Sequence, residues 1–128
     1  MTPAVRITAL RHVYPDGQVA LDGVDLVIAV GERVAVLGPN GAGKTSLMLH
    51  LNGVLTAGAG IVEIGGIPVV RKTLRQIRQR VGLVFQDPDD QLFMPTVAQD
   101  VAFGPANFGV TGDALAERVR AALEAVSL

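Results

Sequence analysis

The sequence predicts an α/β fold in which strands dominate the first two thirds of the chain and helices the remainder. Three observations support this prediction. Apolar and polar residues alternate near the N-terminus, a glycine-rich loop separates a β-branched run from a helical segment, and helical periodicity takes over after residue 90. The 128 residues carry 11 Lys and Arg against 12 Asp and Glu. With this balance, no global positive field attracts nucleic acid, and we expect no nucleic-acid partner.

Several short segments are predicted to be strands. In residues 5–9 the odd-numbered positions are apolar, and in residues 24–28 the even-numbered ones are, which is typical of half-exposed antiparallel strands. Residues 33–37 and 81–85 are near-continuous apolar runs, typical of parallel strands that are covered on both faces. The pair Gly65-Gly66 between two apolar runs predicts a tight hairpin.

Helical patterns follow the glycine-rich loop and return near the C-terminus. Residues 44–53 predict a helix that ends near Gly53. Thr96 followed by Gln99 fits a capping box, and apolar residues recur at helical spacing over 115–126. We therefore predict a nucleotide-binding β and loop portion over 1–90, and the start of a helical subdomain over 91–128.

The absence of cysteine, the positions of the two histidines and the pattern of basic residues bear on other classes of site. With no cysteine there is no disulfide framework or thiolate metal site, which makes a cytoplasmic protein the default expectation. His12 and His50 lie far apart in sequence with no ligand spacing, so neither is predicted to bind zinc, and His50 is expected on the exposed side of its helix. The basic segment 71–80 predicts an amphipathic helix with a solvated face.

The chemistry is expected at a loop that matches GxxxxGK(S/T) between a predicted strand and a predicted helix. Glycines let successive backbone N–H groups turn toward an anion, and the helix N-terminus adds partial positive charge. Lys44 is placed to neutralise phosphate, and the Thr45 hydroxyl to bind Mg²⁺. The predicted nucleotide-binding residues here are Gly38, Pro39, Asn40, Gly41, Ala42, Gly43, Lys44, Thr45 and Ser46. By itself the loop indicates a nucleotide but no reaction, since kinases, GTPases and transport ATPases share it.

Read together with its flanks, the loop resembles that of ABC-type ATPases. Tyr14 in Val-Tyr-Pro-Asp-Gly, the segment 20–26 and the pair Gly31-Glu32 precede the loop in the family's order. In such proteins the aromatic residue before the first hairpin stacks on adenine, and the resemblance gives Tyr14 that role. The family usually continues Gly-Lys-Ser-Thr, whereas this chain has Thr45-Ser46, which still supplies a hydroxyl at the metal position.

Residues 84–93 resemble the glutamine loop of the same family. The resemblance implies that Gln86 senses nucleotide, with its amide oxygen reaching Mg²⁺ and the attacking water. It also makes Gln86 and Lys44 the expected catalytic residues. The neighbouring Asp87, Asp89 and Asp90 are interpreted as a solvated acidic loop and are assigned no metal.

Residues 100–108 narrow the resemblance to the ATPases of energy-coupling-factor and cobalt or nickel uptake transporters. This implies a P-loop nucleotide-hydrolase fold of ABC type and an ATP-binding subunit, peripheral on the inner face of the cell membrane. Its implied partners are ATP with Mg²⁺, a second ATPase subunit arranged head to tail, and a transmembrane coupling subunit that contacts 87–108. The apolar residues there either dock that subunit or form the core of the helical subdomain, and both alternatives stay open: Leu92, Phe93, Met94, Phe103 and Phe108.

Later motifs of the family do not occur in these residues: there is no Leu-Ser-Gly-Gly-Gln signature and no apolar strand ending in Asp-Glu. We therefore expect one truncated domain over 1–128, with antiparallel strands, part of a parallel core sheet and the first helices of the helical subdomain. Such a chain is expected to bind ATP without hydrolysing it alone. A regulatory module that binds nucleotide without hydrolysis is the alternative. A soluble ABC protein of translation or DNA repair is disfavoured by residues 91–108, and a small kinase by Tyr14 and Gln86 at ABC spacing.

Overall fold

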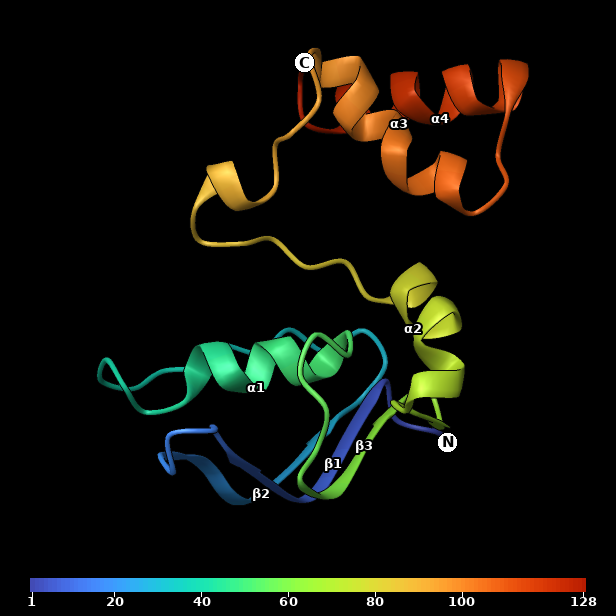
Figure 1. The fold of residues 1–128 in the computed structure, drawn as a ribbon. Helices are drawn as coiled ribbons and strands as arrows, with labels where there is room; N and C mark the ends of the chain where they lie inside the picture. Colours follow the sequence, from blue (N-terminus) through green and yellow to red (C-terminus); the bar gives the residue numbers. More distant parts are fainter. The chain divides into compact units, whose positions relative to one another are not determined.

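The computed structural model describes residues 1–128, which form two compact units, Met1–Leu83 and Val84–Leu128. Figure 1 shows strands and helices in the first unit and only helices in the second. The division falls a few residues before the boundary at residue 90 that the sequence suggests.

The first unit is built on a four-stranded antiparallel sheet with the order β2-β1-β3-β4. Its strands are β1 Val5–Val13, β2 Val19–Ile28, β3 Ala59–Ile64 and β4 Ile67–Pro68. The predicted Gly65-Gly66 hairpin is confirmed between β3 and β4, with φ of 55° and 82° at the two glycines. Positive φ at both central residues is what a tight hairpin needs.

Helix α1, Lys44–Leu51, covers one face of this sheet (Figure 1). The core between them holds one buried apolar residue from the helix and four from the strands: Leu47, Ile7, Leu10, Leu21 and Val62. The strands and the helix after the glycine-rich loop thus share one apolar cluster. Helix α1 and the loop before it are held against the sheet by this packing.

The alternation predicted for residues 5–9 ends earlier than expected. Ile7 is buried, but Ala9 is exposed with φ of 49°, and Leu10 takes the next core position. The pairings of β1 with β2 and with β3 both shift register across this point. A bulge inserts one residue into a strand, so the predicted alternation does not continue to Ala9.

The two near-continuous apolar runs, 33–37 and 81–85, are not strands in this chain. No sheet pairing includes them, and Val34 is 45% exposed, Leu37 88% and Val84 87%. The prediction that they are buried parallel strands is therefore wrong for the 128 residues. A strand is stabilised by partners on its edges, and every pairing formed here is antiparallel and lies within β1–β4.

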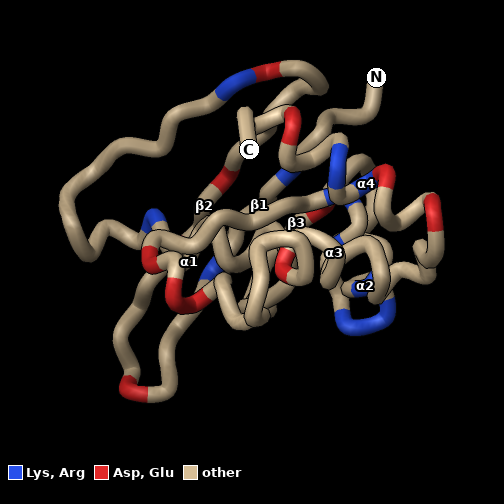
Figure 2. Tube along the Cα trace, turned by 90° about the horizontal axis from the view of Figure 1, so that it is seen from above, with Lys and Arg blue, Asp and Glu red and all other residues tan.

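The basic segment forms a short 3₁₀ turn, η1 Arg71–Thr73, followed by helix α2 Leu74–Arg80. Lys and Arg residues gather at this helix in Figure 2. Ile77 is fully buried while the basic residues are exposed, which confirms the predicted amphipathic helix with a solvated face. Arg78 Nε donates to the carbonyl of Asn52 at 3.2 Å, just beyond the end of α1. A cation at this position stabilises a helix C-terminus.

The second unit consists of the 3₁₀ turn η2 Pro88–Asp90 and the helices α3 Val97–Asn107 and α4 Gly112–Ala125. The predicted capping box is confirmed: the Gln99 N–H donates to Thr96 Oγ1 at 3.2 Å, and the Thr96 N–H donates to Gln99 Oε1 at 3.1 Å. Helices α3 and α4 pack on each other. In neither unit is a helix long and apolar enough to cross a membrane.

Candidate functional site

The glycine-rich loop, Gly38–Gly43, ends at the first turn of α1. Gly43 is the N-cap residue with φ of 101°, and no side chain caps the helix. Gly41 also has a positive φ, 86°. The first turn of a helix leaves backbone N–H groups without helical partners, so this uncapped end offers donors and partial positive charge to an anion.

Gly43 must be glycine for a second reason, which is its contact with β2. A Cβ atom at this position would lie 2.5 Å from the carbonyl oxygen of Ala20 and 3.1 Å from Leu21 Cδ2. No real Cβ atom makes so close an approach. The loop therefore lies directly against the backbone of β2, which fixes the position of the helix N-terminus relative to the sheet.

Lys44 and Thr45 present the polar groups of the loop. Lys44 is half-buried and its Nζ donates to the carbonyl of Gly38, so its ammonium lies back over the loop. Thr45 is exposed, and its hydroxyl is open to a ligand. An uncapped helix N-terminus, loop glycines with positive φ, a loop lysine and an exposed threonine together fit the phosphates of a nucleotide with Mg²⁺.

Tyr14 lies at the end of β1 in a turn closed by its own backbone. The Gly17 N–H donates to the Tyr14 carbonyl at 2.9 Å, and the Tyr14 N–H donates to Gln18 O at 2.9 Å. Its hydroxyl is 2.7 Å from Ser46 Oγ, within the first turn of α1. The structure therefore brings Tyr14 to the glycine-rich loop, as the predicted nucleotide site needs. Ser46 is 7% exposed, and its hydroxyl forms a hydrogen bond with the Tyr14 hydroxyl.

Two histidines lie beside Tyr14, and the prediction that His50 lies on the exposed side of its helix is wrong. His50 is 1% exposed rather than on the outside of α1, and its ring lies 4.9 Å from that of His12, centre to centre. His50 Nδ1 is 2.6 Å from the carbonyl oxygen of Ser46. Burial, reinforced by the nearby His12, lowers the pKa of His50 despite this hydrogen bond. The helical phase shared by Ser46, Leu47 and His50 was the signal that could have revealed a buried imidazole.

Gln86 belongs to the second unit, whereas the loop belongs to the first. It is exposed, in the bend that follows the extended segment 81–85. Its role toward Mg²⁺ and water stays a prediction. Asp87 accepts a hydrogen bond from the Asp89 N–H at 2.9 Å and thereby begins the η2 turn. None of the acidic residues groups with two other potential metal ligands.

The apolar residues beside this turn are largely exposed. Leu92 and Phe93 are each 61% exposed and Phe103 is 44% exposed, and the two phenylalanine rings meet edge to face at 4.8 Å. Asp100 Oδ1 accepts from the N–H groups of Phe93 and Met94 at 3.2 Å, which fixes their segment to α3. An interior position is therefore excluded for Leu92, Phe93 and Phe103 within this unit.

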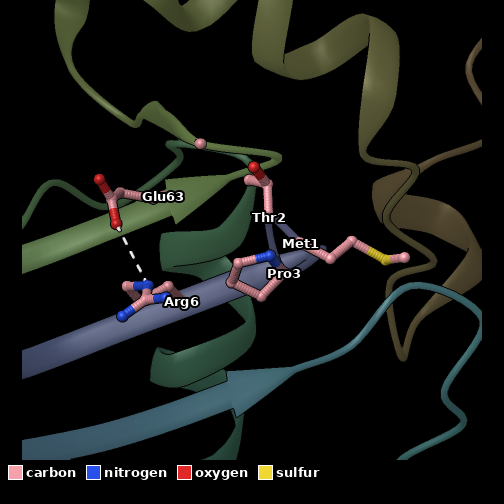
Figure 3. A pocket seen from close by; sticks show the side chains of 6 residues that line it. Met1, Thr2, Pro3, Arg6 and Glu63 are labelled. Atoms are coloured by element: carbon pink, nitrogen blue, oxygen red, sulfur yellow. Dashed lines mark ion pairs between the residues drawn. The ribbon is translucent and has the colours of Figure 1, made fainter.

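A separate pocket of about 390 Å³ lies at the N-terminal edge of the sheet (Figure 3). It is lined by Met1, Thr2, Pro3, Arg6, Glu63 and Gly66. Arg6 Nε lies 3.8 Å from Glu63 Oε2, so the two charges in the pocket offset each other. Figure 1 shows the N-terminus and the glycine-rich loop at opposite ends of the first unit. This pocket is therefore no part of the loop site.

Comparison with known proteins decides the family. A family model described as ABC transporter matches residues 21–128, which is most of the chain and includes the glycine-rich loop. The chain belongs to the ABC transporter family. The resemblance carried by Tyr14, the loop and the segment around Gln86 is thereby confirmed at the level of the family.

Curated relatives of this ABC chain include a putative ABC transporter ATP-binding protein of Streptomyces avermitilis. It is 60% identical over 126 residues, which cover 98% of this chain and 48% of the relative. The energy-coupling factor transporter ATP-binding protein EcfA of Carboxydothermus hydrogenoformans is 51% identical over 128 residues, which cover 100% of this chain and 47% of the relative. The chain thus spans about half the length of the curated relatives it matches.

A solved structure is also similar to this ABC chain. CbiO1 from Clostridium perfringens, described as part of the ABC transporter complex cbiONQ, matches with a TM-score of 0.81 and 38% identity. The match covers 97% of this chain and 50% of CbiO1. It confirms the predicted ABC-type fold for the part of such a domain that these residues form.

Proposed function

We propose that this chain provides the Mg-ATP-binding loop of a transporter ATPase of the energy-coupling-factor type. One observation supports this most strongly. The loop Gly38–Gly43 precedes an uncapped helix whose first turn carries Lys44 and Thr45, and the Tyr14 hydroxyl contacts Ser46 in the same turn. Backbone donors, an ammonium, a hydroxyl and an aromatic ring are the groups that bind a purine nucleoside triphosphate.

Each residue has a distinct part in this proposal. The backbone of Gly38–Gly43 holds the phosphates, and Lys44 moves from the Gly38 carbonyl to neutralise them. The Thr45 hydroxyl would hold Mg²⁺, which supplies positive charge to the phosphate oxygens when bound. Tyr14 contributes a π face for the base, which typically adds about 1 to 3 kcal/mol.

Hydrolysis by the whole protein is part of the same proposal. Gln86 would orient the attacking water through its amide oxygen. A family signature from a second subunit and a carboxylate after an Asp-Glu strand would complete the reaction. The names of the relatives, all ATP-binding proteins of transporters, support this function.

The proposed partners are a second ATPase subunit and a transmembrane coupling subunit. Exposed Leu92, Phe93 and Phe103 favour docking over burial for the apolar residues of 87–108. Large exposed apolar side chains in a cluster are typical of protein contacts. The membership of CbiO1 in an ABC transporter complex and the EcfA name support a role in a transporter. The proposed cargo is a metal ion or a vitamin, taken up at the inner face of the membrane.

The decisive experiment measures Mg-ATP binding by calorimetry in the wild type and in Lys44→Ala. Loss of a charge-assisted contact typically costs about 1.5 to 3 kcal/mol, or roughly 10- to 100-fold in affinity. Lys72→Ala is the matched control, because Lys72 is the second of the two lysines and is exposed outside the loop. Equal ATP affinity in the wild type and Lys44→Ala would exclude the loop as the binding site.

A further inference from the structure

The proposed function assigns no role to His12 and His50. His50 extends from α1 and His12 from β1, and the two rings lie 4.9 Å apart at an interplanar angle of 74°. The His12 ring in turn meets the ring of Tyr14 edge to face at 4.7 Å. The three rings therefore form a continuous row of edge-to-face contacts from the buried face of α1 to the end of β1.

Ser46 connects the two ends of this row. Its hydroxyl lies 2.7 Å from the Tyr14 hydroxyl, and its carbonyl oxygen lies 2.6 Å from His50 Nδ1. Tyr14 is thus held at its hydroxyl by α1 and at its ring by His12, which rests on His50. Both supports begin within the first two turns of the helix that follows the glycine-rich loop.

The bulge at Ala9 is what turns this part of β1 toward α1. Before the bulge Ile7 faces the core, and after it Leu10, His12 and Tyr14 do. With uninterrupted alternation His12 and Tyr14 would point to the opposite face of the sheet. The Ala9 N–H donates to Asp25 Oδ1 at 2.7 Å. A Cβ at Gly60 would lie 2.3 Å from Ala9 O, so Gly60 is needed for the bulge.

Packing alone does not account for imidazoles at these positions. The Nε2 atoms of His12 and His50 are buried and have no hydrogen-bond partner. A buried polar atom without a partner is unfavourable, and an aliphatic side chain at position 50 would avoid that cost. Such groups need a physical explanation, and the ring contacts with Tyr14 are the geometry that suggests one.

We propose that His12 and His50 are positioning residues that hold the Tyr14 ring beside the first turn of α1, where it contacts the base of a bound nucleotide. This rests on the proposed function, because Tyr14 acts here as the base-stacking residue. The histidines touch neither phosphate nor metal in this scheme. Their effect on nucleotide binding is therefore exerted through Tyr14 alone.

Tyr14 provides its own spectroscopic probe, since the chain has one tyrosine and no tryptophan. Replacing His50 with leucine keeps an apolar side chain in the core but removes the ring contact with His12 and the hydrogen bond to Ser46. We expect acrylamide to quench Tyr14 fluorescence more strongly in His50→Leu than in the wild type, with no nucleotide present. His12→Leu should show the same change and serves as the second variant if His50→Leu does not fold.

Binding is then measured for two probes, ATP and inorganic tripolyphosphate, which has no base. His50→Leu should weaken ATP binding about five- to tenfold, at the low end of the roughly 5- to 150-fold that stacking of one base can contribute. Tripolyphosphate affinity should not change. In a Tyr14→Ala background, His50→Leu should have no further effect on ATP.

Leu47→Val is the matched control, because Leu47 is also buried on α1 but packs in the apolar cluster. It should lower stability while leaving the Tyr14 quenching and the ratio of the two affinities unchanged. Unaltered quenching and ATP affinity in both histidine variants would overturn the inference, and so would a parallel loss of tripolyphosphate affinity. Failure of the wild type to bind ATP in a Lys44-dependent way would instead overturn the proposed function, while Tyr14 quenching would still test the positioning contact.

Discussion

At the scale of single residues, the glycines of the loop are not equivalent. Gly41 and Gly43 both have positive φ, but only Gly43 is pressed against a neighbouring strand. In the sequence, both positions are simply glycine, so the difference between them cannot be seen. Their surroundings differ because β2 passes behind one of them and leaves the other open.

We expect Gly43→Ala to be far more damaging than Gly41→Ala. Both changes place a Cβ on left-handed backbone, which costs roughly 1 to 2 kcal/mol. At Gly43 the new atom also meets the Ala20 carbonyl at 2.5 Å, whereas at Gly41 no atom lies within 4 Å. Urea denaturation followed by circular dichroism measures both variants. Equal losses of stability would show that backbone conformation alone determines the effect.

At the scale of elements, the two helices of the second unit begin differently. Thr96 accepts a hydrogen bond from the Gln99 N–H at the start of α3. Thr111 occupies the same N-cap position of α4 and makes no side-chain cap. The same residue type therefore stabilises one helix start through its hydroxyl and the other only through its backbone conformation.

Thr96→Ala is expected to destabilise the second unit by about 0.5 to 2 kcal/mol, the usual cost of removing a capping hydroxyl. Thr111→Ala is its matched control and should change stability much less, since no capping bond is lost. Helix content on titration with denaturant, measured by circular dichroism, compares the two. A larger loss in Thr111→Ala would contradict the role of the cap.

At the scale of the whole molecule, the buried imidazole makes stability depend on pH. Burial lowers the pKa of His50 below its ordinary value of 6.5. Above pH 6.5 the ring is neutral in both folded and unfolded chains, and its contribution to stability is fully present. Below that value the unfolded chain takes up a proton that the folded chain resists. Stability then falls until the pH reaches the lower pKa of the folded state.

The free energy of unfolding should therefore decline as the pH is lowered through and below 6.5, and His50→Leu should reduce this slope. Urea titrations at a series of pH values measure it. Other titrating groups leave a residual slope that both proteins share, so the comparison between them is the test. An identical pH dependence in the wild type and His50→Leu would contradict a depressed His50 pKa.

Catalysis is also a property of the whole molecule. The 128 residues contain the loop and Gln86 but neither the signature nor an Asp-Glu strand. We expect the chain alone to bind Mg-ATP without turnover above background, because each missing 1.36 kcal/mol of transition-state stabilisation costs about tenfold in rate. A phosphate-release assay tests this, with Lys44→Ala as the control. Turnover that depends on Lys44 would show that these residues suffice for hydrolysis.

The sequence predicted features that depend on near neighbours in the chain. The Gly65-Gly66 hairpin, the Thr96 capping box and the amphipathic α2 are all confirmed, because each needs only a few adjacent residues. The family could also be predicted, since the loop motif and its flanks have a fixed order and spacing. Residues 33–37 and 81–85 were predicted wrongly, because a strand depends on partners that its own sequence does not specify.

Only the tertiary structure decided how the site is supported. The bulge at Ala9 depends on Asp25 and Gly60, which are distant in sequence, and it changes which residues of β1 face α1. For the same reason His12 and His50, far apart in the chain, come together beneath Tyr14. Sequence by itself determined the family, through the order of its motifs, and the local turns, whose hydrogen bonds close within a few residues. The burial and pairing of side chains were decided by the fold, because they depend on register and packing between distant segments.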